Sequence, residues 1–321
     1  MTDDQRQGPQ GLQKFVPMLL IKTQNDRRIA RLGEQSRRGD HFFMNRLEAF
    51  RSIAVQAGRG ELVFPTNVNA SIKLQQALND PNCHLEAASK LVMAEPLLSA
   101  RTVAIANSAA YNRSGGEINN VRTAVMRLGF KTLNAITTAV IVRQLGRNIS
   151  DPEMRVKAAQ LWEHTANVAA LAQVIALKMT RLDPETAMFA GIVHEVGGFY
   201  LLSRTDEFPG LLDGNAEDWA EYGEKMIGRA VLKKLGIPEA VMAAVESLWH
   251  GIRVLPPETL GDVLLLAKEL SPVPSPFQKS VLEAGRQSDT IVDEYMGDDS
   301  LRDVLEDSAD EIRSLTSALL I

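Results

Sequence analysis

The chain has 321 residues, of which 45% are hydrophobic and 23% charged. This composition is that of a folded globular protein with one large domain or two smaller ones, and it excludes a largely disordered chain. Aromatic residues make up only 5%, which favours packed helices over a β-sandwich. The single cysteine, Cys83, excludes an internal disulfide and fits a reducing compartment.

The net charge of −5 is distributed unevenly along the chain. Residues 1–60 carry eleven Lys and Arg against six Asp and Glu, whereas residues 281–321 carry three Arg against eleven Asp and Glu. These opposite charges suggest contact between the two ends or two separate partner surfaces, although ordinary solvated helix faces explain them more simply.

The N-terminal residues contain no apolar secretion signal, because MTDDQRQGPQG is polar. Apolar runs such as Ala139–Val142 and Val263–Ala267 are too short to span a bilayer. We therefore expect a cytoplasmic protein with no membrane partner.

Residues 1–60 are predicted to form a basic helical extension. One helix begins near Phe15, and Gly39-Asp40 ends it and caps a second helix, which closes at Gly58. The arginines suggest nucleic-acid binding as an alternative function, but no interleaved aromatics or Gly-rich loop support it, and we do not expect a nucleic-acid partner. Those arginines are Arg37, Arg38, Arg46, Arg51 and Arg59.

Residues 61–150 are predicted to form an N-terminal helical bundle. Helical spacing of apolar residues, Pro at first helical positions and polar breaks give its elements. The expected helices follow Pro65, cover Leu85–Met93, run from Pro96 to Asn107, and cover Ile118–Leu128 and Leu133–Leu145 on either side of a break at Gly129.

Residues 151–270 are predicted to form a second bundle. A helix over 156–179 places His164 on its apolar face, and a helix capped by Asp183 carries the apolar segment Met188–Leu202. Its small residues, such as Ala190 and Gly191, allow close approach of another helix. Further helices are expected over Tyr222–Leu235, from Pro238 toward Trp249, and over Thr259–Leu270.

Residues 271–321 are predicted to be a Pro-rich linker followed by an acidic helical tail. The tail keeps an apolar helical stripe that includes Leu301, Ile312, Leu315 and Leu319, so we expect it to dock on the bundle. No segment alternates with a period of two residues, and the predicted fold class is all-α.

A histidine and a glutamate, His194 and Glu195, lie in the middle of the apolar segment. Burying a carboxylate beside an imidazole is costly unless the two are paired, hydrogen-bonded or bound to a metal. Helical bundles build metal sites from a few ligands on each helix, and His164 lies on another predicted core helix. The segment is therefore either an active site or the remnant of one.

The chain carries a series of short motifs over about residues 61–270. They are Leu62-Val63-Phe64-Pro65, Asn79-Asp80-Pro81, Glu95-Pro96-Leu97-Leu98, Ala106–Tyr111, Ala124–Gly129, Leu161–His164, Phe189–His194, Tyr222-Gly223 with Ile227-Gly228, and Leu235-Gly236-Ile237-Pro238. In this order they resemble the HDOD domain, the HD-related output domain of bacterial signalling proteins in the HD phosphohydrolase superfamily. The resemblance implies an N-terminal bundle joined to an HD-like bundle and a regulatory rather than hydrolytic role.

Compared residue by residue with the metal ligands of HD proteins, this sequence has an incomplete set. His164 and His194 match the two histidines, Glu195 replaces an aspartate, and Lys268 replaces the final aspartate. A lysine offers no metal ligand while it is protonated. We therefore expect no catalytic residue, no cofactor and no metal, and an ion pair between Glu195 and Lys268 in the place of the metal.

The resemblance leads to a non-catalytic signalling protein that binds a partner protein. The alternative is a metal-dependent phosphohydrolase acting on nucleotides or cyclic dinucleotides. The polar loop after Asn107 is the best candidate binding surface, through Asn107, Ser108, Tyr111 and Arg113, although capping of the helix end is the stronger expectation for the first two. The sequence leaves the oligomeric state open.

Overall fold

The computed structural model describes residues 45–113, 115–213, 218–249, 254–277 and 299–321. The chain divides into two units, Met1–Asn45 and Arg46–Ile321, and the fold below is that of the second unit. The described part of the predicted extension 1–60 is therefore mainly one helix, α2 (Arg46–Gly58). The helix expected near Phe15 and the cap at Asp40 lie outside the described residues.

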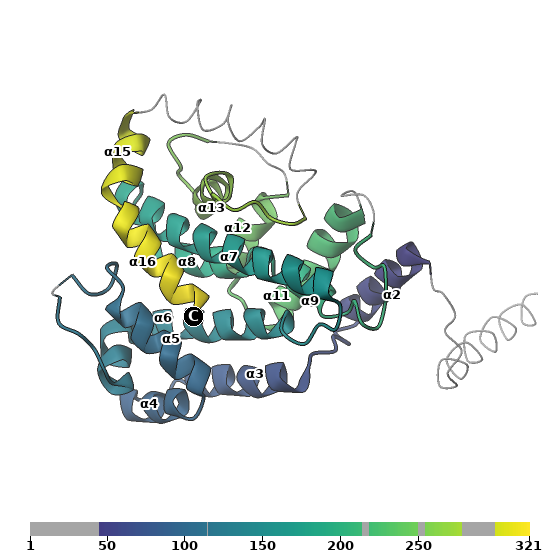
Figure 1. Cartoon of the computed structure of the whole chain (residues 1–321), viewed down its shortest axis with the longest axis horizontal. Coiled ribbons are helices and arrows are strands. Elements are labelled where there is room, and N and C mark those ends of the chain that lie inside the picture. The colour runs from purple at the N-terminus through teal and green to yellow at the C-terminus, as the bar shows by residue number, and fades with distance from the viewer. Residues whose placement is uncertain (1–44, 114, 214–217, 250–253, 278–298) are drawn as a thin grey trace, which may run out of the picture. The chain divides into compact units, whose positions relative to one another are not determined.

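The described residues contain helices and no strand, which confirms the all-α prediction (Figure 1). The first group comprises α3 (Thr66–Leu78), α4 (Leu85–Met93), α5 (Pro96–Asn107) and α6 (Val121–Leu145). The second comprises α7 (Pro152–Met179), α8 (Pro184–Val193), α9 (Val196–Leu202), the π-helix η1 (Trp219–Gly228), α11 (Arg229–Lys234), α12 (Glu239–Ser247) and α13 (Leu260–Glu269). The tail forms α15 (Asp299–Asp307) and α16 (Ala309–Leu320).

Three helices begin with an acidic residue followed by proline, as the sequence predicts for two of them. The carboxylates of Glu95, Asp151 and Asp183 accept hydrogen bonds from backbone N–H groups in the first turns of α5, α7 and α8. Each proline stands where its missing N–H is not needed. Because Asp151 caps it in this way, α7 begins at Pro152, four residues before the predicted start at Val156.

Helix α6 bends at Gly129, as predicted. The backbone there has φ 74° and ψ 171°, a conformation that disfavours any side chain. Helix α6 is long and apolar enough to cross a membrane by length and composition alone, but 67% of its most apolar window is buried inside the bundle. Both groups of helices pack around α6, and a helix that is buried on most sides is apolar on most sides.

The two groups of helices share one aliphatic core. Helix α6 packs against α3, α4 and α5 on one side and against α8 and α9 on the other. Helices α7 and α8 make the most extensive contact, which depends on the small residues predicted there. A Cβ atom on Gly191 would lie only 2.5 Å from Cα of Ala169 in α7.

The acidic tail docks on the bundle, as its apolar stripe predicts. Leu301, Leu315 and Leu319 are at most 1% exposed. Helix α16 packs along α7 and α5, and its C-terminal end reaches α5 and α6 in Figure 1.

Candidate functional site

The backbone breaks at the His-Glu pair. A continuous helix through Met188–Leu202 was expected, and this prediction is wrong, because α8 ends at Val193 and α9 begins at Val196. Glu195 lies between them with φ −116° and ψ 29°, outside the helical region. The break lets His194 and Glu195, which are consecutive in the chain, direct both side chains toward α7 and α13.

The two glycines after the pair allow neighbouring segments to approach closely. A Cβ atom on Gly197 would lie 2.7 Å from the carbonyl oxygen of Gly223 in η1, and one on Gly198 would lie 2.6 Å from the ring of Phe277. Any larger residue would push these segments away from the break.

His164 and His194 face each other through their Nε2 atoms, which are 3.3 Å apart. The Nδ1 atom of His164 lies 2.6 Å from the carbonyl oxygen of Val273, and that of His194 lies 2.7 Å from the carbonyl oxygen of Gly191. A carbonyl oxygen only accepts, so each Nδ1 carries a proton and donates it. In the neutral state both Nε2 atoms therefore direct lone pairs into the space between the rings.

Glu195 completes this cluster from the backbone break. Its Oε1 atom lies 4.0 Å from Nε2 of His164 and 3.9 Å from Nε2 of His194. The same oxygen is 2.9 Å from Nζ of Lys268, which confirms the predicted ion pair. The second carboxylate oxygen accepts a 2.6 Å hydrogen bond from the Ser275 hydroxyl.

Burial and charge set the protonation state of the cluster. Burial lowers the pKa of His164 and lowers that of His194 to about 3, and Lys268 lowers both further although Glu195 opposes it. Burial alone would raise the pKa of Glu195, but Lys268 and the hydrogen bond from Ser275 bring it well below its usual range. Burial likewise disfavours the charged form of Lys268, yet Glu195 raises its pKa. The stable state has two neutral histidines and one buried ion pair.

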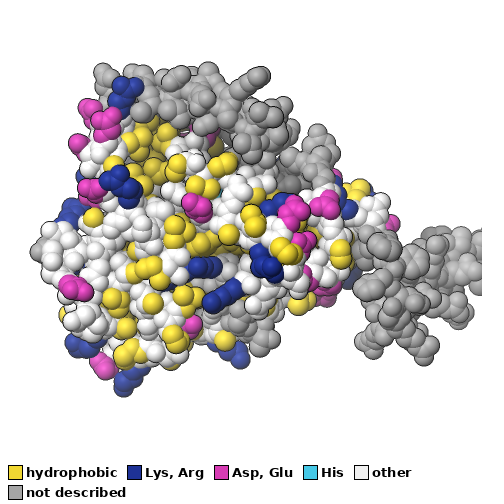
Figure 2. Space-filling view, viewed as in Figure 1, with side chains coloured by type: hydrophobic (Ala, Val, Ile, Leu, Met, Phe, Trp, Pro, Cys, Tyr) yellow, Lys and Arg dark blue, Asp and Glu magenta, His cyan; other side chains and the backbone are white. Residues whose placement is uncertain are grey.

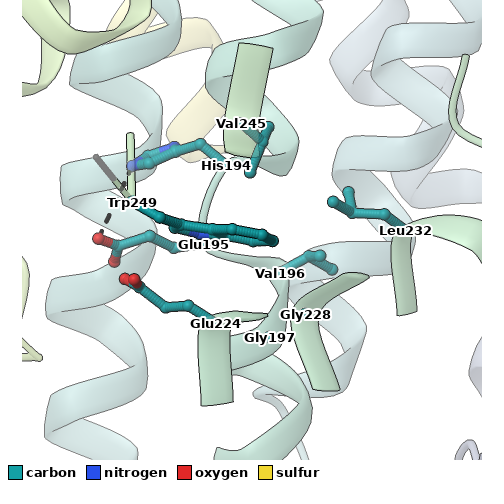
Figure 3. Close-up of a pocket in the computed structure, with 9 residues that line it drawn as sticks. All are labelled: His194, Glu195, Val196, Gly197, Glu224, Gly228, Leu232, Val245 and Trp249. Carbon is teal, nitrogen blue, oxygen red and sulfur yellow. Dashed lines mark ion pairs between the residues drawn. The ribbon is translucent and has the colours of Figure 1, made fainter. Parts of the chain in front are cut away.

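The cavity beside the cluster is small. It has a volume of about 10 Å³, which is room for about one water molecule. The indole of Trp249 crosses this space, and Glu195 and Glu224 direct their carboxylates to the same side of it (Figure 3). The charge of Glu224 also raises the pKa of Lys268.

The segment after α13 forms part of the site rather than only a linker. The carbonyl of Val273 fixes the His164 ring, Ser275 donates to Glu195, and the carbonyl of Pro274 accepts from the Gln160 amide at 3.0 Å. Sequence reasoning missed these residues. Alternating prolines at 272, 274 and 276 indicate an extended segment, but they do not indicate where that segment lies.

The predicted binding loop is held mainly by internal hydrogen bonds. Asn107 exchanges two hydrogen bonds with the backbone of Ile118, at 2.6 and 2.8 Å, and the Ser108 hydroxyl donates to the carbonyl of Ile105. The Tyr111 hydroxyl accepts from Gln173 at 2.7 Å, and burial raises its pKa to about 12. Asn107 also donates to the carbonyl of Val103 in the last turn of α5, which together with the Ser108 bond confirms the capping expected for these two residues. Arg113 is exposed, and ligand binding by this loop stays a prediction.

Three residues of the cluster have the chemistry of metal ligands. One ligand atom from each of His164, His194 and Glu195 lies within 4.8 Å of the other two. The fourth position does not fit a metal, because the ammonium of Lys268 binds the carboxylate oxygen that faces the imidazoles. A divalent cation there would be repelled by that ammonium at close range.

Comparison with known proteins shows the family and the fold of this chain. The family model described as HDOD domain matches residues 64–249, which is more than half of the chain. No curated protein that was compared matches this sequence.

Three solved structures share the fold. A protein of Shewanella amazonensis, provisionally named a metal-dependent phosphohydrolase, has 23% identity and a TM-score of 0.62, over 86% of this chain and all of its own. An HDOD domain protein of unknown function from Geobacter sulfurreducens has 21% identity and a TM-score of 0.54, over 85% of this chain and 99% of its own. A second Shewanella amazonensis protein, provisionally named a phosphohydrolase, has 20% identity and a TM-score of 0.54, over 83% of this chain and 98% of its own.

Proposed function

Because the chain belongs to the HDOD family, we propose that it is a cytoplasmic, non-catalytic signalling protein that acts by binding a partner protein. The observation that carries the proposal is the 2.9 Å ion pair between Lys268 and Glu195 in the degenerate HD site. The pair makes the cluster a structural element that joins α7, the α8–α9 junction and α13.

The ion pair opposes metal-dependent hydrolysis in two ways. The lysine offers three donors and no ligand, and it binds the only carboxylate among the three metal-ligand candidates. Its positive charge also disfavours a second cation within a few ångströms.

The size of the cavity supports the same proposal. A volume of about 10 Å³ leaves no room for a nucleotide, whereas pockets for small molecules usually have several hundred Å³. The buried carboxylate and imidazoles thus face the interior of the bundle.

Metal analysis of the purified full chain tests the proposal. We expect no stoichiometric iron, manganese or zinc in the wild type after purification without chelator. The double variant Glu195→Asp with Lys268→Asp restores the HD ligand types, and we expect it to take up metal when it is supplied. Lys268→Met is the matched control, because it removes the charge without adding a ligand. Stoichiometric metal in the wild type would overturn the proposal.

Partner binding requires a separate experiment. The full chain, immobilised through an added tag, is used to capture partners from its native lysate, and a reproducible signalling partner that binds the purified chain directly is the expected result. Failure of every captured protein to bind the purified chain would contradict a role through protein partners.

A metal-dependent phosphohydrolase is the second candidate, and one observation favours it. The two Nε2 lone pairs converge at 3.3 Å, with a carboxylate oxygen about 4 Å away. Hydrolysis of nucleotides or cyclic dinucleotides by wild type with added manganese or iron would establish this function. The hydrolysis would also have to be lost in the variant His164→Gln, which would exclude a contaminating enzyme.

A further inference from the structure

A fully buried arginine without a partner lies outside the degenerate site. The side chain of Arg101 in α5 is 0% exposed, and none of its three guanidinium nitrogens has a hydrogen-bond partner among the residues that the structure describes. A guanidinium carries five N–H donors and one positive charge, and burying it without an acceptor is strongly unfavourable. The described part of the fold therefore contains a buried charge whose hydrogen-bonding groups it does not satisfy.

The surroundings of Arg101 are rich in donors. Its guanidinium carbon lies 5.1 Å from the centre of the Trp162 ring, and that of Arg143 lies 5.8 Å from the same ring. The indole Nε1 of Trp162 is a second buried donor without a partner. The face of an indole attracts a guanidinium, but it accepts no conventional hydrogen bond from it.

The charges around Arg101 are mostly of its own sign. Burial is the main cause that lowers the pKa of Arg101 to about 9, and the charges of Arg143 and Arg147 lower it further. Glu95 opposes them, but its carboxylate already caps the first turn of α5 through the N–H of Leu98. At neutral pH the guanidinium of Arg101 remains charged, and no carboxylate among the described residues is hydrogen-bonded to it.

The three arginines differ in burial. Arg147 is exposed, Arg143 is half-buried and Arg101 is enclosed. Lys and Arg side chains gather near the end of α16 on the face shown in Figure 2.

The C-terminal helix α16 contacts the helices that carry Arg101, Arg143 and Trp162. It packs against α5 and α7, which carry Arg101 and Trp162. At its end, the carbonyl of Leu320 accepts a 3.0 Å hydrogen bond from Arg143. In its middle, Thr316 has a buried hydroxyl without a partner. The contact of α16 thus satisfies Arg143 in part and leaves Arg101 unsatisfied.

We propose that Arg101, Arg143 and Trp162 form a binding site for a phosphate group, and that α16 closes this site and must lift away for the phosphate to enter. Guanidinium groups bind phosphate oxygens through paired N–H donors, and a phosphate would supply the acceptors that the donors of Arg101 lack. A bound phosphate would also replace the Leu320 carbonyl as the acceptor for Arg143. The inference is independent of the degenerate site, because Trp162 and His164 are two residues apart on α7 and so project to nearly opposite faces.

Thermal unfolding of the full chain with pyrophosphate tests the site, with sodium chloride of equal ionic strength as the reference. We expect pyrophosphate to raise the unfolding midpoint of the wild type. The variant Arg101→Met should start at a higher midpoint than the wild type, because the unpaired charge is gone, and should show no response. The exposed Arg181→Met is the matched control and should respond as the wild type does. An unresponsive wild type, or an equal response in Arg101→Met, would overturn the site.

A second variant keeps the test decisive if Arg101→Met does not fold. Arg143→Met should lower the affinity for pyrophosphate by several-fold, since Arg143 loses its contact to the anion. An unchanged affinity would contradict the proposal. Equal responses to pyrophosphate and to a nucleoside diphosphate would identify the phosphate group alone as the ligand, and a stronger response to the nucleotide would add a contact to the base.

The role of α16 has its own measurement. Hydrogen exchange of the α16 amides should become faster when pyrophosphate binds. Leu319→Ala weakens the docking of α16. Because α16 must lift away before the anion binds, this variant should lower the half-saturating concentration of pyrophosphate by several-fold. Slower exchange in α16 on binding would show that the helix encloses the anion rather than competing with it, and would refute the proposed opening.

Discussion

Lys268 and Glu195 depend on each other for their charged states, because each is enclosed by protein and has the other as its principal counter-charge. The side chain of Glu195 is 3% exposed and that of Lys268 is 15% exposed. Removing one member of such a pair leaves the other buried and unpaired, which is usually worse than replacing both.

Lys268→Met is therefore expected to lower the free energy of unfolding by about 3–5 kcal/mol. Urea unfolding followed by circular dichroism measures the change. Lys157→Met is the matched control, because Lys157 pairs with the exposed Glu153 one helical turn away, and a change within about 0.5 kcal/mol is expected there. A Lys268→Met protein as stable as the wild type would rule out a structural role for the pair.

The buried histidines predict a particular dependence of stability on pH. The pKa values of His164 and His194 are both lowered in the folded protein, that of His194 to about 3, so the unfolded chain binds more protons below its histidine pKa of about 6.5. Stability is then fully present above about pH 6.5 and falls as the pH drops toward 3, by about 1.4 kcal/mol per pH unit for each histidine that stays neutral.

Unfolding midpoints between pH 7.5 and 5 measure this effect. The lowered pKa of Glu195 adds a further loss only below its unfolded value of about 4.5. His194→Gln should therefore make the unfolding midpoint change less with pH between pH 7.5 and 5. A wild-type midpoint that stays constant from pH 7 to 5 would contradict the presence of two neutral histidines in the folded protein.

The principal side chains of the site could be predicted from the sequence, whereas their supporting contacts could not. His164, His194, Glu195 and Lys268 stand at recognisable positions in motifs. Val273 reaches His164 across 109 residues, and this contact depends on the path of the chain after α13. Local periodicity contains no information about such a path.

At the scale of helices, the sequence predicts where a helix begins better than where it is interrupted. The acidic cap and proline before α5 and α8 are readable in the sequence because they act within one turn. The break at Glu195 lies inside a continuous apolar segment, so the hydrophobic pattern continues through it. The π-helical turns of η1 likewise change the backbone hydrogen bonds without an obvious change in composition.

Gly191→Ala tests the closest contact between helices. The added methyl group would meet the backbone of Ala169 at 2.5 Å, so α7 and α8 would have to separate, and we expect a loss of about 1–3 kcal/mol. Thermal or urea unfolding measures it. Gly58→Ala is the control, because nothing lies within 4 Å of the new Cβ atom, and it should leave stability nearly unchanged. Equal effects of the two substitutions would refute the close packing.

At the scale of the described unit, the shared core predicts one cooperative unfolding transition rather than two. Leu98 in α5 and Leu264 in α13 are each 0% exposed and belong to the same core. Leu98→Ala and Leu264→Ala should each cost about 2–5 kcal/mol and shift the whole transition. Calorimetry and tryptophan fluorescence should agree on the midpoint of each variant. Separate transitions for the two variants would instead indicate two independently folding bundles.

The segment after α13 determines which fragments of this protein keep the complete site. The family match ends at residue 249, but the groups that neutralise and orient the His-Glu pair follow later, at Lys268, Val273 and Ser275. A fragment that stops at the edge of the family domain would thus keep both histidines and Glu195 while losing the counter-charge and one carbonyl that orients a ring. Such a fragment would be a poor sample for judging metal affinity, since it lacks the ammonium of Lys268, which we propose disfavours a cation beside His164, His194 and Glu195.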